Sequence, residues 1–208
     1  MEVNVQKKWF DLCERLGVNI KLAEETFEQL SDAYSYPPRI YHSLEGHVSA
    51  GLLILEDIRM QGIAKNFNAL QFAWFCHDAI FDPKAKDNEE KSAEFAVNIA
   101  RKFGLSEGFC KAVRGLVIVT HRPVIPEDID DRLIIDLDHL NFGWDNPSFK
   151  EQTQAIREEC EDVSDEDFEK GNEKLFTKIL KKKTIFLSKF FQERYERRAR
   201  SNLERALM

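Results

Sequence analysis

Apolar residues recur at every third or fourth position along most of the chain, which is the period of a helix that turns one side toward a core. A glycine follows three of these stripes, at Gly17, Gly62 and Gly104, as is typical of the residue after a helix end. No pair of alternating segments indicates a β-hairpin. The stripes predict an all-α protein with helices within residues 9–16, 22–30, 48–58, 93–103, 106–120 and 129–140.

Residues 69–81 differ from the other stripes because they are apolar on nearly all sides, which predicts a central buried helix. Further along the chain, residues 142–147 have the composition of a loop. Ser164 and the acidic residues after it are typical of a helix start. Residues 175–207 then continue as helix, with a break near Lys183.

Composition agrees with a soluble helical protein. Of the 208 residues, 43% are hydrophobic and 32% are charged, and both glycine and proline are scarce. We expect a single domain, 1–208, with a helical-bundle core at about 20–145 and a long C-terminal helical region at 148–208. The net charge of −7 argues against nucleic acid as a partner.

Cysteine spacing and the N-terminal residues indicate the cellular compartment in which we expect the protein. The four cysteines are far apart and form no CxxC pair, which argues against a disulfide framework or a thiolate zinc site. The first residues contain no apolar signal segment, and no apolar run is long enough to cross a membrane. We expect a reduced, cytoplasmic protein with no membrane partner.

The sharpest chemical feature is the pair His77-Asp78, which closes the apolar run 72–81. Burying an ionised carboxylate there without compensation costs several kcal/mol. A divalent cation would compensate the charge, and imidazole with carboxylate suits zinc, manganese, iron, cobalt or nickel. The plain alternative is a hydrogen-bonded core histidine beside a helix-end aspartate.

The same argument applies to the apolar run that contains Asp136 and Asp138. Residues two positions apart point about 200° apart on a helix, so only one of the two carboxylates can face a shared site. Asp138 has an alternative partner in Arg132 or Arg122. Periodicity leaves the choice between Asp136 and Asp138 open.

Four sequence blocks resemble a known family when they are taken in order. They are Arg39-Ile40-Tyr41-His42, the run 74–83 around His77-Asp78, the run Asn88–Ala93, and Asp136-Leu137-Asp138. Together with His47 they resemble the HD-domain superfamily of metal-dependent phosphohydrolases. More narrowly, they are similar to the small bacterial predicted metal-dependent HD phosphohydrolases, over roughly residues 5–205.

The resemblance implies a ligand set for a first divalent metal ion: His47, His77, Asp78 and Asp138. Asp138 is preferred to Asp136 because Asp138-His139-Leu140 looks like the last ligand motif of the superfamily. The resemblance does not distinguish Mn, Co, Ni, Fe, Zn or Mg.

His42 resembles the first histidine of the motif in cyclic-nucleotide phosphodiesterases, which implies a general acid that protonates the leaving oxygen. Its five-residue spacing from His47 departs from the usual four. On a regular helix this spacing places the two side chains about 140° apart. His42 must therefore lie in the loop before the helix, or one of the two assignments is wrong.

The implied activity is hydrolysis of a phosphate ester, such as a nucleotide or another small phosphorylated metabolite. Asp78 would also orient the attacking water, and Glu89 could face the site from the start of its helix, although helix capping is its ordinary role. The cations nearest the motifs are expected to bind the substrate phosphate: Arg39, Lys91 and Arg122.

Two alternatives stay open at this point. One is an HD-fold module that senses a nucleotide or serves as a scaffold without turnover. The other is a di-iron oxygenase, which needs further histidines before the last aspartate, where only His121 is available. The sequence also leaves open whether the chain forms a homodimer.

Overall fold

The computed structural model describes residues 3–35, 39–82, 85–121 and 125–208. Within this part the chain is helical and contains no strand, which confirms the predicted all-α class. Two short elements accompany the α-helices: η1, a π-helical turn at Leu44–Val48, and η2, a 3-10 turn at Leu140–Gly143. The α-helices are α1 (Val5–Arg15), α2 (Ile20–Ser35), α3 (Ser49–Met60), α4 (Phe67–Cys76), α5 (Asn88–Lys102), α6 (Glu107–Val119), α7 (Ile129–Asp138), α8 (Asn146–Glu159), α9 (Asp165–Leu180) and α10 (Lys189–Ala206).

The chain divides into two compact units, Met1–Ile134 and Ile135–Met208, with the boundary inside α7. The boundary that we predicted from the sequence, between the core and the C-terminal helices, lies later in the chain, after residue 145. No described helix combines the length and the apolar content that crossing a bilayer requires.

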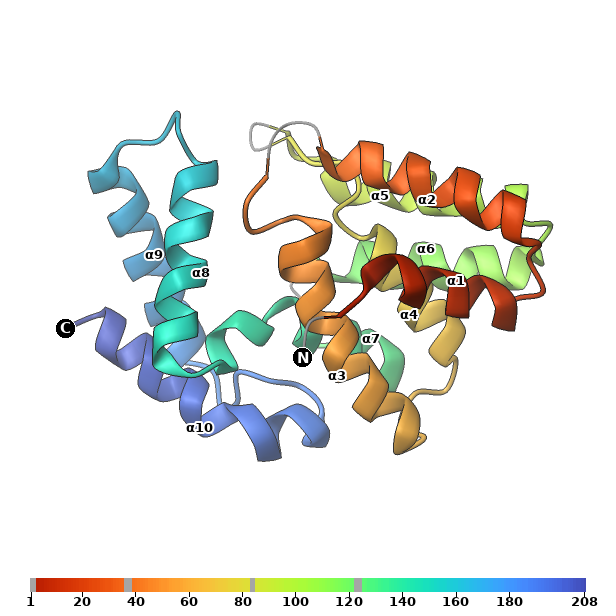
Figure 1. Ribbon diagram of the computed structural model, residues 1–208. Coiled ribbons are helices and arrows are strands. Elements are labelled where there is room, and N and C mark those ends of the chain that lie inside the picture. Colours follow the sequence, from red (N-terminus) through yellow and green to blue (C-terminus); the bar gives the residue numbers. More distant parts are fainter. Residues whose placement is uncertain (1–2, 36–38, 83–84, 122–124) are drawn as a thin grey trace. The chain divides into compact units, whose positions relative to one another are not determined.

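In the first unit, α4 is the central helix and lies against α1, α3, α5 and α6 (Figure 1). All eight residues from Ala69 to Cys76 are buried, as the all-round apolar pattern predicted. The predicted helix ends near Gly17, Gly62 and Gly104 are confirmed, because all three glycines have positive φ.

The prediction that this helix continues to Phe81 is wrong, because α4 ends at Cys76. Side chains from distant parts of the chain form hydrogen bonds with backbone groups that would otherwise bond within a continued helix. The Arg39 guanidinium donates to the carbonyls of Asp78 and Ala79. Ser92 Oγ accepts from the Ile80 amide at 3.0 Å and donates to the Ile80 carbonyl at 3.1 Å. The residues after His77 therefore form a loop that is fixed by its own hydrogen bonds.

In the second unit, the predicted helix start at Ser164 is confirmed, since its hydroxyl accepts from the Asp167 amide at the start of α9. The break near Lys183 is also confirmed, because it lies between α9 and α10. The loop prediction for 142–147 is wrong at both ends, where η2 and α8 intrude. α8 lies within the predicted C-terminal helical region 148–208, but it begins earlier, at Asn146, after the Asp145 cap.

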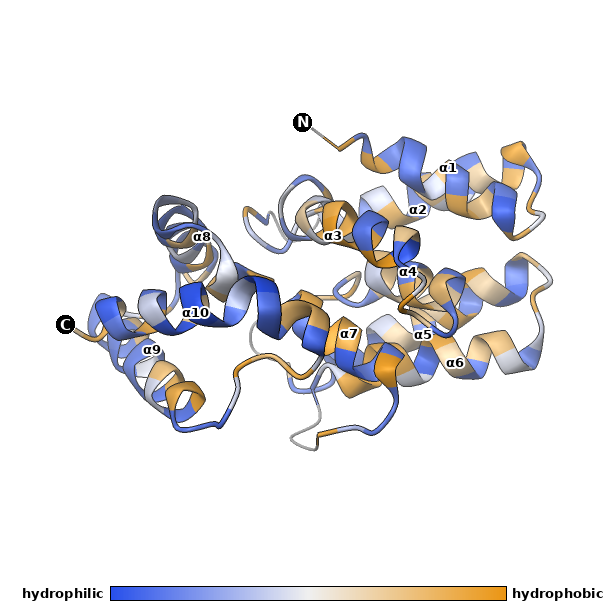
Figure 2. Ribbon diagram, turned by 90° about the horizontal axis from the view of Figure 1, so that it is seen from below, coloured by the Kyte–Doolittle hydropathy of each residue, from blue (hydrophilic) through white to orange (hydrophobic). Residues whose placement is uncertain are grey.

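Asn202 holds α10 to the segment before α8. Its amide donates to the carbonyls of Phe142 at 2.9 Å and Trp144 at 2.8 Å. Figure 2 colours α10 mostly as hydrophilic, and the side that faces the unit carries Phe191, Tyr195 and other buried residues. One apolar side therefore suffices to pack this long, mostly polar helix against the rest of the unit.

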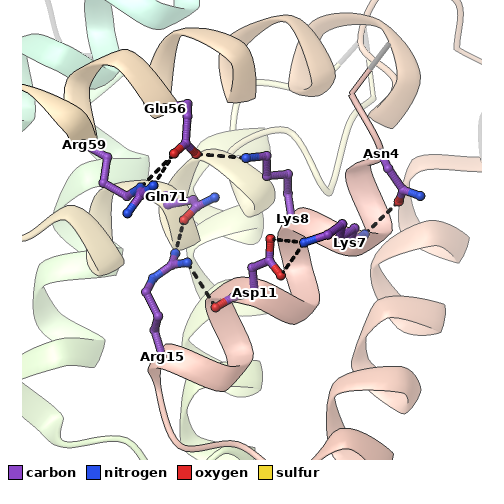
Figure 3. A network of polar contacts seen from close by, with 8 residues as sticks. All are labelled: Asn4, Lys7, Lys8, Asp11, Arg15, Glu56, Arg59 and Gln71. Carbon is purple, nitrogen blue, oxygen red and sulfur yellow. Dashed lines mark hydrogen bonds and ion pairs between the residues drawn. The ribbon is translucent and has the colours of Figure 1, made fainter. Parts of the chain in front are cut away.

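A polar network on the surface of the first unit joins α1 to α3 and α4 (Figure 3). The Glu56 carboxylate on α3 accepts from Lys8 Nζ at 2.8 Å and from Arg59 Nε at 3.0 Å. Arg15 donates to the side chain of Gln71 on α4. Glu56 thus joins one cation on its own helix to another on α1.

We predict that Glu56→Gln lowers the free energy of unfolding at pH 7 by about 0.5–1 kcal/mol, because Glu56 is only partly buried. Hydrogen bonds from Arg59 and Lys8 lower the pKa of Glu56 to about 2, from an ordinary 4.5. Its stabilising effect is therefore complete above about pH 4.5 and is lost as the pH falls toward 2.

Urea unfolding at pH 7 and pH 3 tests this. The difference between wild type and Glu56→Gln should shrink at pH 3. Glu24→Gln, an exposed substitution on α2, is the control and should differ little from wild type at either pH. A Glu56→Gln deficit that stays constant with pH would contradict the assignment.

Candidate metal centre

His47 lies in the π-helical turn η1, directly before α3. Ser43 begins this turn by accepting from the Gly46 amide at 3.0 Å, and the His47 amide donates to the Tyr41 carbonyl at 3.0 Å. His42 lies in the bend before η1, with its ring 6.2 Å from the ring of His47. Of the two alternatives that the five-residue spacing left open, the structure has the first, with His42 in the loop before the helix.

His77 follows the last residue of α4 and is 2% exposed. Its Nδ1 lies 2.8 Å from the carbonyl oxygen of Trp74. A carbonyl can only accept, so Nδ1 carries the hydrogen. Its Nε2 lies 3.0 Å from an oxygen of Asp78. An unprotonated nitrogen and a carboxylate oxygen repel each other at that distance, so the pair requires either a second proton on the imidazole or a cation.

The Asp78 carboxylate is held ionised by its surroundings. Burial by itself would raise the pKa of Asp78, but the charge and the hydrogen bond of His77 outweigh burial, and the charges of His42 and His47 add to them. The net effect is a pKa below the ordinary value of an aspartate. This lowered pKa belongs to the pair with a charged His77; a metal ion on Nε2 of His77 would take the place of that proton as the compensating charge.

The guanidinium of Arg39 fixes the loop that carries Asp78. Besides the carbonyls of Asp78 and Ala79, it donates to the carbonyl of Ala33 at 2.8 Å. It also lies over the rings of Tyr34 and Phe81, at 5.0 and 5.3 Å from their centroids. Arg39 therefore supports the loop, and its role in binding a substrate phosphate stays a prediction.

Asp138 is the last residue of α7, the helix that begins in the first unit. His47, His77, Asp78 and Asp138 each offer one ligand atom, and these four atoms lie within 4.8 Å of one another. Both histidines are buried and both aspartates are partly exposed. The predicted ligand set is therefore brought together as a group that could hold a metal ion.

Asp136 has a different role from Asp138. Its carboxylate oxygens accept from the backbone amides of Leu187 at 2.6 Å and Ser188 at 2.7 Å, just before α10. Burial raises the pKa of Asp136 to about 6, against the opposing effect of these hydrogen bonds. The choice left open by periodicity is thus resolved: Asp138 joins the histidines, and Asp136 supports the backbone of the second unit.

The other predicted residues lie outside the four-residue group. Glu89, at the start of α5, has an oxygen 3.3 Å from His121 Nδ1. Lys91 pairs with Asp87 at 2.9 Å on an exposed face of the same helix. Arg122 lies outside the described residues. The roles assigned to Glu89, Lys91 and Arg122 stay predictions.

Periodicity and motif spacing missed a close packing contact behind the site. The Trp74 ring lies so near Gly51 of α3 that a Cβ atom on that glycine would be 2.3 Å from it. The sequence signal was limited to an aromatic residue three positions before His77. A contact between two helices cannot be read from one segment.

We predict that Gly51→Ala displaces the Trp74 ring and lowers the free energy of unfolding by about 1–3 kcal/mol, the usual effect of overpacking. It should also weaken divalent metal binding, because His77 stacks on that ring. Gly115→Ala on α6 is the matched control, since a Cβ there meets nothing within 4 Å. Thermal unfolding with and without Co²⁺ measures both effects, and equal behaviour of the two variants would contradict the contact.

We further predict opposite defects for the two aspartates of α7. Asp136→Ala leaves two backbone amides without their acceptor and should cost about 2 kcal/mol of stability, while Co²⁺ still raises the melting temperature. Asp138→Ala should abolish the Co²⁺-induced rise. Calorimetry with and without Co²⁺ tests the pair, and a lost metal response in Asp136→Ala alone would reverse the assignment.

Comparison of the chain with protein-family models, with curated proteins and with solved structures gives no match. The case for a metal centre therefore rests on the chemistry and the geometry of these four side chains.

Proposed function

We propose that this protein hydrolyses a phosphate ester with the help of a divalent metal ion held by His47, His77, Asp78 and Asp138. The observation that carries the proposal is the convergence of two imidazoles and two carboxylates, with their ligand atoms within 4.8 Å of one another. The substrate class is a small phosphorylated metabolite, with nucleotides as the leading candidates.

The residues fit a divalent cation of the first transition series. Two nitrogen and two oxygen donors suit manganese, iron, cobalt, nickel or zinc. A ligand imidazole usually donates its other ring N–H to a carbonyl or carboxylate, which fixes its orientation. The bond from His77 Nδ1 to the Trp74 carbonyl is such a contact.

The accessible side of the group is formed by its carboxylates. His47 and His77 are 5% and 2% exposed, whereas the Asp78 side chain is 23% exposed. A bound divalent cation neutralises charge on phosphoryl oxygens and makes water a stronger nucleophile near pH 7. Asp78, which is both a ligand and partly open to solvent, is the residue best placed to accept a hydrogen bond from the attacking water.

His42 is the proposed general acid for the leaving oxygen. Its ring stacks on Phe81, with centroids 4.8 Å apart and planes 22° apart. That contact limits rotation of the ring. Imidazole exchanges protons near neutral pH, which suits this task. Glu89, whose carboxylate lies 3.3 Å from His121 Nδ1, is proposed as a further catalytic residue.

One observation favours the alternative of a metal-binding module without turnover. Of the cations expected to bind phosphate, Arg39 donates to carbonyls and Lys91 pairs with Asp87. If both stay engaged when a phosphate ester binds, the site has fewer cations to stabilise charge on the reacting group. The two functions differ in turnover and agree in metal binding.

We predict that Asp78→Asn lowers the rate of phosphate-ester hydrolysis by at least about 100-fold and removes the metal-induced rise in melting temperature. The assay uses phosphomonoesters, phosphodiesters and nucleotides with Mn²⁺, Co²⁺ or Ni²⁺, and elemental analysis gives the number of metals per chain. Asp32→Asn, an exposed substitution on α2, is the control and should behave as wild type.

The outcomes separate the candidate functions. Hydrolysis by wild type that is lost in Asp78→Asn supports the phosphohydrolase. Stoichiometric metal with no turnover on any ester supports the binding module. Two irons per chain would favour oxygenase chemistry, and unchanged turnover in Asp78→Asn would reject the proposed site.

A further inference from the structure

Trp74 contacts His77 in two ways. The two rings are stacked, with centroids 4.3 Å apart and planes 15° apart. The backbone carbonyl of the same tryptophan lies 2.8 Å from His77 Nδ1. Trp74 therefore contacts both the face of the His77 imidazole and its Nδ1. The other ring nitrogen, Nε2, lies 3.0 Å from an oxygen of Asp78.

Trp74 also holds the segment that carries His47. Its ring meets the His47 ring edge-on, with centroids 4.8 Å apart and planes 62° apart. Its indole N–H donates to the carbonyl of Val48, the residue after His47, at 2.9 Å. The His47 and His77 rings are 5.4 Å apart, so one indole sets the relation between two histidines that are thirty positions apart in the sequence.

The indole itself has no room to move. Trp74 is 0% exposed, and the absence of a side chain at Gly51 lets α3 approach its ring. A residue that is fully enclosed and bonded at its indole nitrogen keeps a single rotamer. The indole packs against both imidazoles, so this rigidity is passed to them.

From these contacts we infer that Trp74 is the positioning residue of the metal centre, and that it sets a preference for cations that accept nitrogen ligands. The inference rests on the proposed metal site. Cobalt, nickel and zinc use imidazole nitrogen well, whereas Mg²⁺ binds oxygen ligands. Fixed imidazoles therefore benefit the first group of cations, and the carboxylates of Asp78 and Asp138 serve both groups.

The test compares the affinities of Co²⁺ and Mg²⁺ in wild type and in Trp74 variants. Trp74→Leu removes the stacked ring and the indole N–H, and should weaken Co²⁺ binding by about 10–100-fold, as the loss of a group that orients a ligand does. Mg²⁺ affinity should change by less than about threefold, because its oxygen ligands remain. Trp74→Phe keeps an aromatic face but loses the hydrogen bond to the Val48 carbonyl. Its Co²⁺ affinity should lie between those of wild type and Trp74→Leu.

Trp9→Leu is the matched control. Trp9 is also 0% exposed, its indole N–H donates to the Ala23 carbonyl at 3.1 Å, and its ring packs against Phe72 and Phe75 of α4. It should lower the melting temperature about as much as Trp74→Leu while it leaves the ratio of Co²⁺ to Mg²⁺ affinity unchanged. A purely structural role for Trp74 predicts the same behaviour for both variants.

Fluorescence gives a second readout. Co²⁺ bound to the imidazole on which Trp74 stacks should quench the emission of that tryptophan, so the quenching should be lost in Trp74→Phe and kept in Trp9→Phe. The quenching reports only that Co²⁺ binds beside Trp74. If Trp74→Leu does not fold, the Co²⁺-to-Mg²⁺ affinity ratio of Trp74→Phe decides the question. Equal Co²⁺-to-Mg²⁺ ratios in wild type and Trp74→Phe overturn the inference.

The results also separate this inference from the proposed function. Co²⁺ binding that depends on Trp74, with no hydrolysis of any ester, supports the positioning role and rejects the phosphohydrolase. Hydrolysis of an ester, with a Co²⁺-to-Mg²⁺ affinity ratio that is the same in wild type and the Trp74 variants, supports the phosphohydrolase and rejects the positioning role. Wild type that binds no divalent cation rejects both.

Discussion

Compensation of charge around buried imidazoles and carboxylates is the constraint on which the rest of the site depends. His77 lies 3.0 Å from Asp78, and its other nitrogen is already committed to a carbonyl. The pair is stable only with a positive charge between or on its members. That requirement connects the ionised state of Asp78 to the nearby His42 and His47, and it is the physical reason for inferring a cation.

The geometry depends on ending α4 at the right residue. On an uninterrupted helix the side chains of His77 and Asp78 would point about 100° apart. The structure instead ends the helix at Cys76 and satisfies the following backbone through Arg39 and Ser92. Residues distant in sequence thus determine the shape of the loop that presents the ligands.

Part of the site could be read from residue types alone. An aspartate beside a histidine in an apolar run requires compensation wherever it lies, so His77 and Asp78 were identifiable without coordinates. The angle between residues five apart left two alternatives for His42, a place in the loop before the helix or a wrong assignment, and only the structure chose the loop. Asp136 and Asp138 could not be separated in that way, because both lie among apolar neighbours, and only the amides of Leu187 and Ser188 reveal what Asp136 does.

The sequence by itself determined the all-α class, the glycine helix ends, the fully buried character of α4 and the residue types available as ligands. These properties are local, since they follow from the period of the helix and from the cost of burying charge. Tertiary structure alone decided the end of α4, the engagement of Arg39 and the Trp74–Gly51 contact. Each of these depends on groups that meet only after folding, whose partners no single segment can specify.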